Sequence, residues 1–118
     1  MSYNTVVKNT NYFLKQLKRL GKKYPSLKQD VNNLRLTLIE HPRTGENLGQ
    51  GAYKIRLKIT SKGKGKSGGA RVISYVETEI IGIVQNNVVS LLTIYDKGEM
   101  ESMSKEEIAR LIESMEFE

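Results

Sequence analysis

The spacing between apolar residues changes near Pro42, and this change limits the possible folds more than any other feature of the chain. Before Pro42, apolar residues recur every three or four positions, which predicts amphipathic helices. They are Phe13, Leu17 and Leu20, followed by Leu27, Val31, Leu34 and Leu38. Thr10 or Asn11 can cap the first helix and Gly21 ends it, whereas Pro42 ends the second. The two apolar stripes therefore predict a helical hairpin.

The pattern after Pro42 is typical of strands. Residues 42–51 are rich in turn-forming residues and predict a connection. Apolar and basic residues then alternate strictly over 53–59, the period of a half-buried strand. Further strands are predicted over 70–76, with an irregular continuation through 79–84 left open, and over 88–97. Between them, the residues Gln85-Asn86-Asn87 predict a hairpin turn.

The two ends of the chain complete the predicted order. Residues 2–8 are rich in β-branched and aromatic residues and predict a short strand. Ser104 and Glu107 have the spacing of a capping box, which opens a short helix. The apolar face of this helix consists of Ile108, Leu111, Ile112 and Met115. Residues 1–118 thus predict a single α+β domain, with helices packed on one mostly antiparallel sheet.

Charge is distributed unevenly along the chain. Residues 1–76 carry sixteen basic and three acidic residues, a net charge of +13. Residues 77–118 carry three basic and ten acidic residues, a net charge of −7, which leaves +6 for the whole chain. A basic body is typical of proteins that bind a polyanion, most often a nucleic acid. A soluble domain that is simply basic is the alternative.

Composition excludes several kinds of site. The chain has no cysteine, so we expect neither disulfides nor a thiolate metal site nor a cysteine nucleophile. His41 is its only histidine, and the acidic residues are not clustered as metal ligands would be. We therefore expect no metal and no small-molecule cofactor. There is no apolar run long enough to cross a membrane and no secretory signal pattern, so we expect a cytoplasmic protein with no membrane partner.

A loop of glycine and lysine residues spans 61–69. Gly63, Gly65 and Gly68 match a dinucleotide-binding fingerprint, but that fingerprint needs a helix after the loop, and here a strand is predicted. Nucleotide binding is therefore not expected. The loop is either a solvated hairpin connection or a flexible approach to a nucleic-acid backbone, and these two interpretations are compatible.

The basic residues of the alternating strand are a sharper signal. Lys54, Arg56 and Lys58 lie on one face of the strand, where their mutual repulsion is unfavourable unless an anion lies across them. Arg71 is expected on the neighbouring strand. Arginine binds phosphate bidentately, so this group favours phosphate recognition. The alternative is the solvent face of an edge strand, where lysines discourage aggregation.

Three short segments, in this order and spacing, resemble the RelE/ParE superfamily of bacterial toxins, with the HigB-like branch of RelE closest. They are Lys54-x-Arg56, Gly68-Gly69-Ala70-Arg71-Val72 and Tyr95-Asp96-Lys97. The N-terminal strand, the basic helical hairpin and the C-terminal helix agree with the superfamily, so the resemblance covers almost the whole chain. It implies a RelE-like fold.

The resemblance also implies a function. RelE-type toxins are ribonucleases of type II toxin–antitoxin systems that cut messenger RNA on the ribosome and are neutralised by a cognate antitoxin protein. They use no metal: the RNA 2′-hydroxyl attacks the adjacent phosphate, assisted by lysines and arginines. The partners implied for this chain are therefore an antitoxin, the ribosome and messenger RNA.

Carried over by motif, the implied catalytic residues are Lys54, Arg56, Arg71 and Lys97. Lys54 would act as general base or charge stabiliser, Arg56 and Arg71 would bind the phosphate, and Lys97 would contact the phosphate or the leaving group. The implied RNA-binding residues are Lys58, Lys62, Lys64, Lys66 and Tyr95, the last by base stacking if its ring is not part of the core.

One departure from the superfamily affects the proton-transfer roles. Some RelE proteins carry a functional tyrosine shortly after the position of Lys97, but residues 98–107 contain neither tyrosine nor histidine. Two alternatives stay open at this point, because one fold can host different activities. The chain could be a ParE-like gyrase inhibitor, or a non-catalytic RNA-binding module of the same fold.

Overall fold

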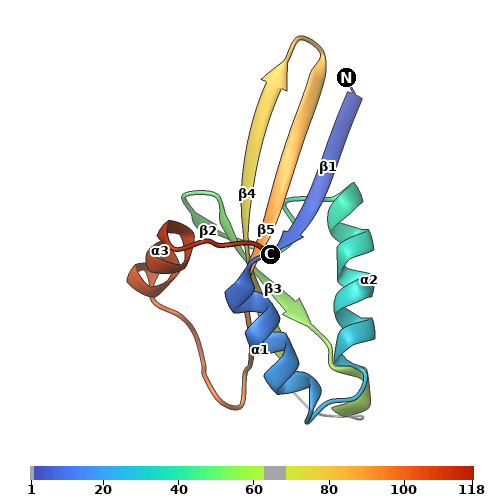
Figure 1. The fold of residues 1–118 in the computed structure, drawn as a ribbon, viewed down its shortest axis with the longest axis vertical. Coiled ribbons are helices and arrows are strands. Elements are labelled where there is room, and N and C mark those ends of the chain that lie inside the picture. The colour runs from blue at the N-terminus through green and yellow to red at the C-terminus, as the bar shows by residue number, and fades with distance from the viewer. Residues whose placement is uncertain (1, 63–68) are drawn as a thin grey trace.

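A computed structural model describes residues 2–62 and 69–118. Five strands, three helices and one 3₁₀ turn alternate along these residues (Figure 1). In chain order they are β1 (Ser2–Asn9), α1 (Asn11–Gly21), α2 (Leu27–Glu40), β2 (Glu46–Gly49), β3 (Ala52–Leu57), η1 (Thr60–Lys62), β4 (Ala70–Ile81), β5 (Val84–Asp96) and α3 (Lys105–Glu113).

The five strands form one sheet in the order β1-β5-β4-β3-β2. Only the β1–β5 pair is parallel, and the other three pairs are antiparallel. The predicted α+β class, with a mostly antiparallel sheet, an N-terminal strand, a helical hairpin and a short C-terminal helix, is confirmed.

Two helix starts follow the capping rules predicted from the sequence. The Thr10 hydroxyl accepts a hydrogen bond from the Phe13 backbone at 3.1 Å and so caps α1. At α3 the capping box is complete, because Ser104 Oγ accepts from the Glu107 backbone and Glu107 Oε1 accepts from the Ser104 backbone. Each bond satisfies a backbone group that the first helical turn leaves without a partner.

The sheet separates two apolar cores. The larger core lies under α1 and α2, where residues such as Phe13, Leu20 and Leu38 meet Val72 and Ile94. The smaller core lies on the other face, where Ile108 of α3 covers residues from three strands. These residues are Ala52, Ile73, Leu92 and Tyr95. The helical hairpin and α3 therefore cover opposite faces of the sheet.

Two predictions about the strands were wrong. The connection over 42–51 contains β2, which pairs with β3. The turn between β4 and β5 lies at Gly82 and Ile83 rather than at 85–87, which are part of β5. Gly82 has a φ of +62°, the left-handed conformation that such tight turns require and glycine adopts without strain.

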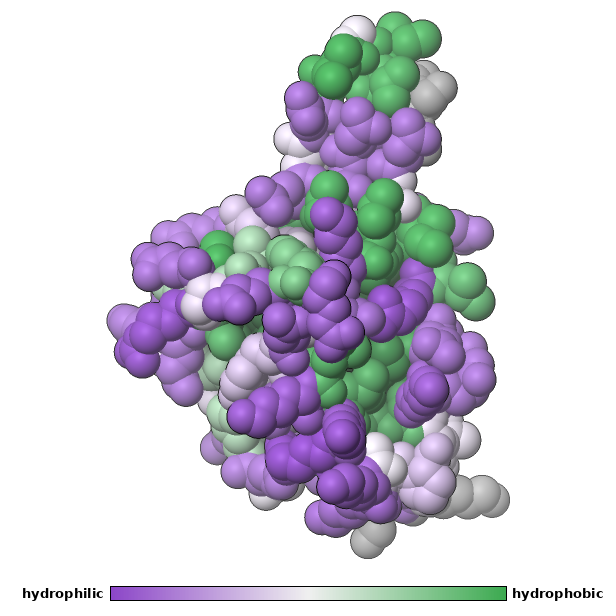
Figure 2. Space-filling view, viewed as in Figure 1, coloured by the Kyte–Doolittle hydropathy of each residue, from purple (hydrophilic) through white to green (hydrophobic). Residues whose placement is uncertain are grey.

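The β4–β5 hairpin projects beyond the helices and ends in an apolar tip (Figures 1 and 2). Ile80, Ile81 and Ile83 are 60–74% exposed there. Below the tip, Thr78 donates a side-chain hydrogen bond across the hairpin to Asn87, and Asn4 of β1 donates one to Asn86 of β5. Within the described part of the chain, no helix is both long and apolar enough to span a membrane.

Candidate nucleic-acid interface

Three predicted site residues lie on one face of the sheet, the face that α3 partly covers. Lys54 and Arg56 alternate along β3, so their side chains point to the same side. Arg56 is the direct antiparallel partner of Arg71 on β4. Directly opposed residues share a face and lie about 5 Å apart at Cα. We call this set, together with the exposed Lys58 beyond the end of β3, the cationic face.

The members of the cationic face differ in burial. Arg56 is exposed, whereas Arg71 is only 6% exposed and donates from Nη1 to its neighbouring Ala70 carbonyl at 3.2 Å. The Lys54 ammonium lies 3.7 Å from the Glu46 carboxylate, which is its partner across the β2–β3 ladder. The face thus combines a fixed guanidinium with an accessible one, an arrangement suited to holding a phosphate.

Lys97 follows β5 directly and is exposed. Its backbone N–H donates to the Gly69 carbonyl at 3.0 Å, which ties it to the residue just before β4. The site therefore draws on β3, β4 and the end of β5. The helices α1 and α2 lie across the sheet from these residues.

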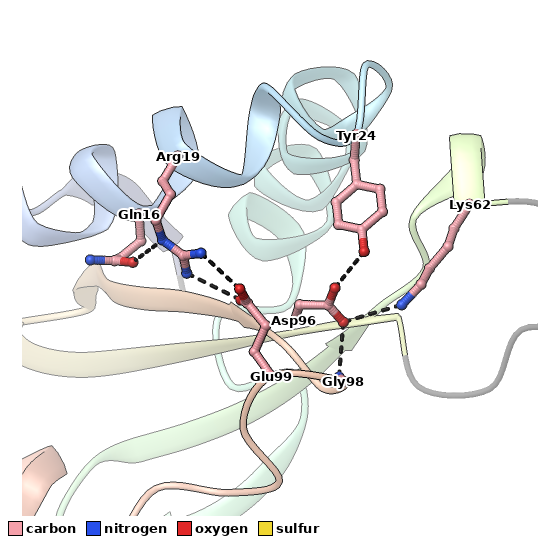
Figure 3. A network of polar contacts seen from close by, with 7 residues as sticks. All are labelled: Gln16, Arg19, Tyr24, Lys62, Asp96, Gly98 and Glu99. Atoms are coloured by element: carbon pink, nitrogen blue, oxygen red, sulfur yellow. Dashed lines mark hydrogen bonds and ion pairs between the residues drawn. The ribbon is translucent and has the colours of Figure 1, made fainter.

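Asp96 organises the end of β5 on the helical-hairpin side (Figure 3). This carboxylate is 2% exposed and accepts hydrogen bonds from Tyr24 at 2.5 Å, the Gly98 backbone at 2.9 Å and Lys62 at 3.1 Å. Burial alone would raise the pKa of Asp96, but these donors outweigh it and hold the pKa below its usual value. The same bond to Asp96 raises the pKa of Lys62.

A second buried carboxylate fixes the η1 turn. Asp30 accepts from the Thr60 backbone at 3.0 Å, from the Thr60 hydroxyl at 2.6 Å and from the Ser26 hydroxyl at 2.7 Å. Burial opposes its ionisation, yet the bonds from Thr60 and Ser26 lower the pKa of Asp30. Two carboxylates therefore position Lys62, the last residue of η1. Asp30 holds the backbone of the η1 turn, and Asp96 binds the Lys62 ammonium.

One ion pair connects α1 to the segment after β5. The Arg19 guanidinium donates to both Glu99 oxygens, at 2.9 and 3.2 Å, and to Gln16 (Figure 3). Both side chains are over 40% exposed, so the pair contributes little to stability. Asp96 and Glu99, which make these polar contacts, lie on the two sides of Lys97 in the chain.

Tyr95 is not available for base stacking in this structure. Its ring is 2% exposed in the small core beneath α3, where it lies opposite Arg71 in the β4–β5 ladder. Burial raises the pKa of the Tyr95 hydroxyl, while the nearby Arg71 charge acts in the opposite direction. Within the described residues this hydroxyl has no hydrogen-bond partner. The core interpretation of Tyr95 is the one that the structure supports.

Comparison with known proteins finds a similar solved structure. No family model matches the chain. A solved structure of the E. coli toxin RelE, a double arginine-to-alanine mutant in the free state, superimposes with a TM-score of 0.51 at 23% sequence identity. The match covers 86% of this chain and 90% of that chain. The chain has a RelE-like fold.

On this RelE-like fold, the pairing of β3 with β4 places Arg56 opposite Arg71. Lys54 is two residues before Arg56 on β3, so its side chain lies on the same face. Lys62 lies on the other side of the sheet edge, against Asp96, rather than with them. Lys64 and Lys66 lie outside the described residues. The described parts of the chain also hold no group of histidine, cysteine or carboxylate side chains that could bind a metal ion.

The sequence prediction missed Asp96 as a structural residue. It appeared only inside the Tyr95-Asp96-Lys97 segment, with no role of its own. A lone carboxylate at the end of an apolar strand, in a chain with few acids before it, is a signal that could have been used. Such a residue is almost never buried unless it is paired.

Proposed function

We propose that this protein is a toxin that inhibits translation by cutting messenger RNA on the ribosome. The observation that carries the proposal is the direct opposition of the exposed Arg56 and the buried Arg71, beside Lys54, on one face of a RelE-like fold. An exposed guanidinium and an ammonium above a buried guanidinium on the same face are suited to a phosphodiester that gains charge during reaction. The protein would act in the bacterial cytoplasm, where a cognate antitoxin would neutralise it.

The proposed reaction is a transesterification without metal or cofactor. The RNA 2′-oxygen forms a bond to the adjacent phosphorus, and the bond from phosphorus to the 5′-oxygen breaks. The 2′-hydroxyl loses a proton and the leaving 5′-oxygen gains one. Arg56 and Arg71 would stabilise the phosphoryl oxygens, and Lys54 would accept the proton or stabilise charge. Lys97 would contact the phosphate or the leaving group.

Backbone contacts outside the reaction centre would come from lysines around it. Lys58 is exposed next to Arg56 and suits contact with RNA phosphates. Lys62, Lys64 and Lys66 would extend these contacts along the glycine-lysine loop. Lys62 would have to share its ammonium with Asp96, which it contacts at 3.1 Å. We assign no base stacking to Tyr95, because its ring is buried.

The test is controlled expression in a bacterium, with growth followed alongside primer extension on a translated message. We expect growth arrest with new cuts at translated codons. Arg56→Ala should abolish both, and Lys22→Ala, which removes an exposed cation from the helical hairpin, should retain both. Arrest with intact messages would instead indicate the gyrase-directed alternative. Absence of arrest from soluble, folded protein would indicate an RNA-binding module without activity.

A further inference from the structure

The outer half of β4, residues 76–81, has a neighbouring strand on one side only. Residues 70–75 pair with β3, whereas residues 76–81 pair only with β5 among the described parts of the chain. Figure 1 shows this half of β4 extending past β3, in the hairpin that projects beyond the helices. We call its side away from β5 the open edge of β4. Such an edge presents backbone donors and acceptors to which another chain can bond.

One hydrogen bond shows which backbone groups face the open edge. The Val76 N–H donates to the Gly51 carbonyl at 2.9 Å, so it faces away from β5. In an antiparallel ladder both backbone groups of a residue face the same side, and the side alternates from one residue to the next. Thr78 and Ile80 therefore direct their N–H and C=O groups to the open edge. Within residues 2–62 and 69–118, no strand lies beside them there.

The side chains between these residues make one face of the open edge acidic. Glu77 and Glu79 lie on the same face as Tyr75, which packs in the smaller core. Both glutamates are exposed, and among the described residues neither forms an ion pair. They line a depression of about 270 Å³ together with Thr78, Asn86 and Val88. Arg43 bonds to the Thr78 hydroxyl and pairs with neither glutamate. The carboxylates are therefore available to a cationic partner.

These charges decide which occupant suits the open edge. A second copy that used both Thr78 and Ile80 would pair them with each other about a twofold axis, and its Glu79 would face the Glu79 of the first copy. Directly opposed like charges are destabilising in a sheet. An RNA strand would bring phosphates next to both carboxylates, which is also unfavourable. A strand with basic side chains at alternate positions would instead pair with both.

From these backbone groups and charges we infer that the open edge of β4 binds a basic strand of a partner protein by main-chain pairing. The backbone of Thr78 and Ile80 would bond to that strand. Its residues opposite Glu79 and Glu77 would be lysine or arginine, and its residue opposite Ile81, which is 61% exposed, would be apolar. For an antiparallel strand, this gives the order apolar-x-basic-x-basic from its N-terminus.

The test uses a synthetic peptide of this pattern, with valine as the apolar residue, threonine at the x positions and lysine at the basic ones. Binding to the purified chain is measured by fluorescence anisotropy at low salt. The double variant Glu77→Gln/Glu79→Gln should bind this peptide about twofold to thirtyfold more weakly, the range for two cross-strand ion pairs. Glu101→Gln/Glu113→Gln removes the same net charge at exposed positions elsewhere and should leave binding unchanged.

Methylated peptides test the main-chain pairing directly. Methyl groups on the backbone nitrogens of the two x residues remove the donors that would face Thr78 and Ile80, so this peptide should not bind. Methyl groups on the backbone nitrogens of the two lysines face away from β4, so that peptide should still bind. Ile80→Pro removes one donor of the open edge and should weaken binding while circular dichroism stays unchanged. If this variant unfolds, the two methylated peptides still decide the question.

Several results would overturn the proposal. Equal binding of the two methylated peptides would show that the main chain is not paired, and peptide binding unaffected by Glu77→Gln/Glu79→Gln would show that the glutamates are not used. Dimers in sedimentation that Ile80→Pro dissociates would make the edge an interface between copies. Weaker binding of an RNA oligonucleotide by the double glutamine variant would make it an RNA surface.

The open edge is separate from the proposed reaction centre. Glu77 is six residues along β4 from Arg71, which corresponds to roughly 20 Å. The peptide assays require no nuclease activity, and the primer-extension assay requires no peptide. Failure of this proposal and failure of the nuclease proposal are therefore observed in different assays.

Discussion

Arg56 on β3 and Arg71 on β4 are direct partners across an antiparallel ladder, so two permanent cations are held side by side. Like charges directly opposed in a sheet are destabilising by roughly 0.2–1 kcal/mol. We therefore expect Arg56→Ala to raise the free energy of unfolding slightly at low salt, and the gain to shrink as salt screens the charges. Urea denaturation at two ionic strengths measures this, and a loss of stability at both would contradict it.

The same substitution should weaken RNA binding. Each phosphate contact that is lost reduces the slope of log affinity against log salt by about 0.7 for single-stranded RNA. Arg56→Ala should show a reduction of that size in a filter-binding titration. Ile83→Asn, a substitution at the exposed tip of the β4–β5 hairpin, serves as a control and should leave the slope unchanged.

Stability should depend on pH through Asp96 and Lys62. The pKa of Asp96 is lowered in the folded state, so its contribution is present above the unfolded value of about 3.9 and is lost as pH falls through the folded value. The pKa of Lys62 is raised, so its contribution is present below about 10.4 and is lost as pH rises through the folded value. Between these limits the pair stabilises the fold.

Asp96→Asn should therefore destabilise the protein most between about pH 5 and 9, by about 1–3 kcal/mol, because buried donors lose a charged acceptor. Glu99→Gln is the matched control, because it neutralises a neighbouring exposed carboxylate and should cost at most about 1 kcal/mol. Thermal unfolding across the pH range measures both. A constant difference between wild type and Asp96→Asn from pH 2 to pH 11 would contradict the assignment.

Ser104 provides a local test of α3. Removing its hydroxyl with Ser104→Ala breaks one bond of the capping box and should cost about 1 kcal/mol. Amides of residues 105–113 should then exchange with solvent about fivefold faster. Ser102→Ala, an exposed serine two residues before the cap, should leave exchange unchanged. Equal effects of the two substitutions would show that the cap does not determine the stability of α3.

Gly69 is constrained where Gly21 is not. Gly69 has a φ of +56°, and a Cβ there would lie 2.7 Å from the Leu57 carbonyl oxygen. Gly69→Ala should cost at least about 1–2 kcal/mol and displace the start of β4. At Gly21 nothing lies within 4 Å of the added carbon, so Gly21→Ala should be neutral or stabilising by up to about 1 kcal/mol. The urea midpoint of Gly69→Ala should fall, and that of Gly21→Ala should stay the same or rise.

The sequence predicted most of the architecture because most of it depends on local periodicity. Alternation over residues 53–59 was sufficient to place Lys54 and Arg56 on one face, and the capping signals at Thr10 and Ser104 were sufficient to place two helix starts. These local signals do not identify the strand with which each strand pairs. The opposition of Arg56 and Arg71 follows from register, which only the folded sheet determines.

The wrong predictions arose where tertiary contacts overrode local preference. Asn86 and Asn87 are turn-forming types, yet their side chains bond across the sheet to Asn4 and Thr78 and so are accommodated within β5. The glycine and asparagine of β2 suggested a loop until β3 provided a partner. Asp96 was missed because its donors Tyr24 and Lys62 are 72 and 34 residues away.

The parallel pairing of β1 with β5 has a consequence for how the chain acquires its structure. Val7 is made early but pairs with Val89, and the capping residue Thr10 bonds to the carbonyl of Leu91. The first strand and the base of the first helix therefore have no partner until nearly the whole chain has been synthesised. Contacts of such long sequence separation form slowly. Folding is accordingly completed around the last strand, late in synthesis or after it, rather than in the order in which the residues are added.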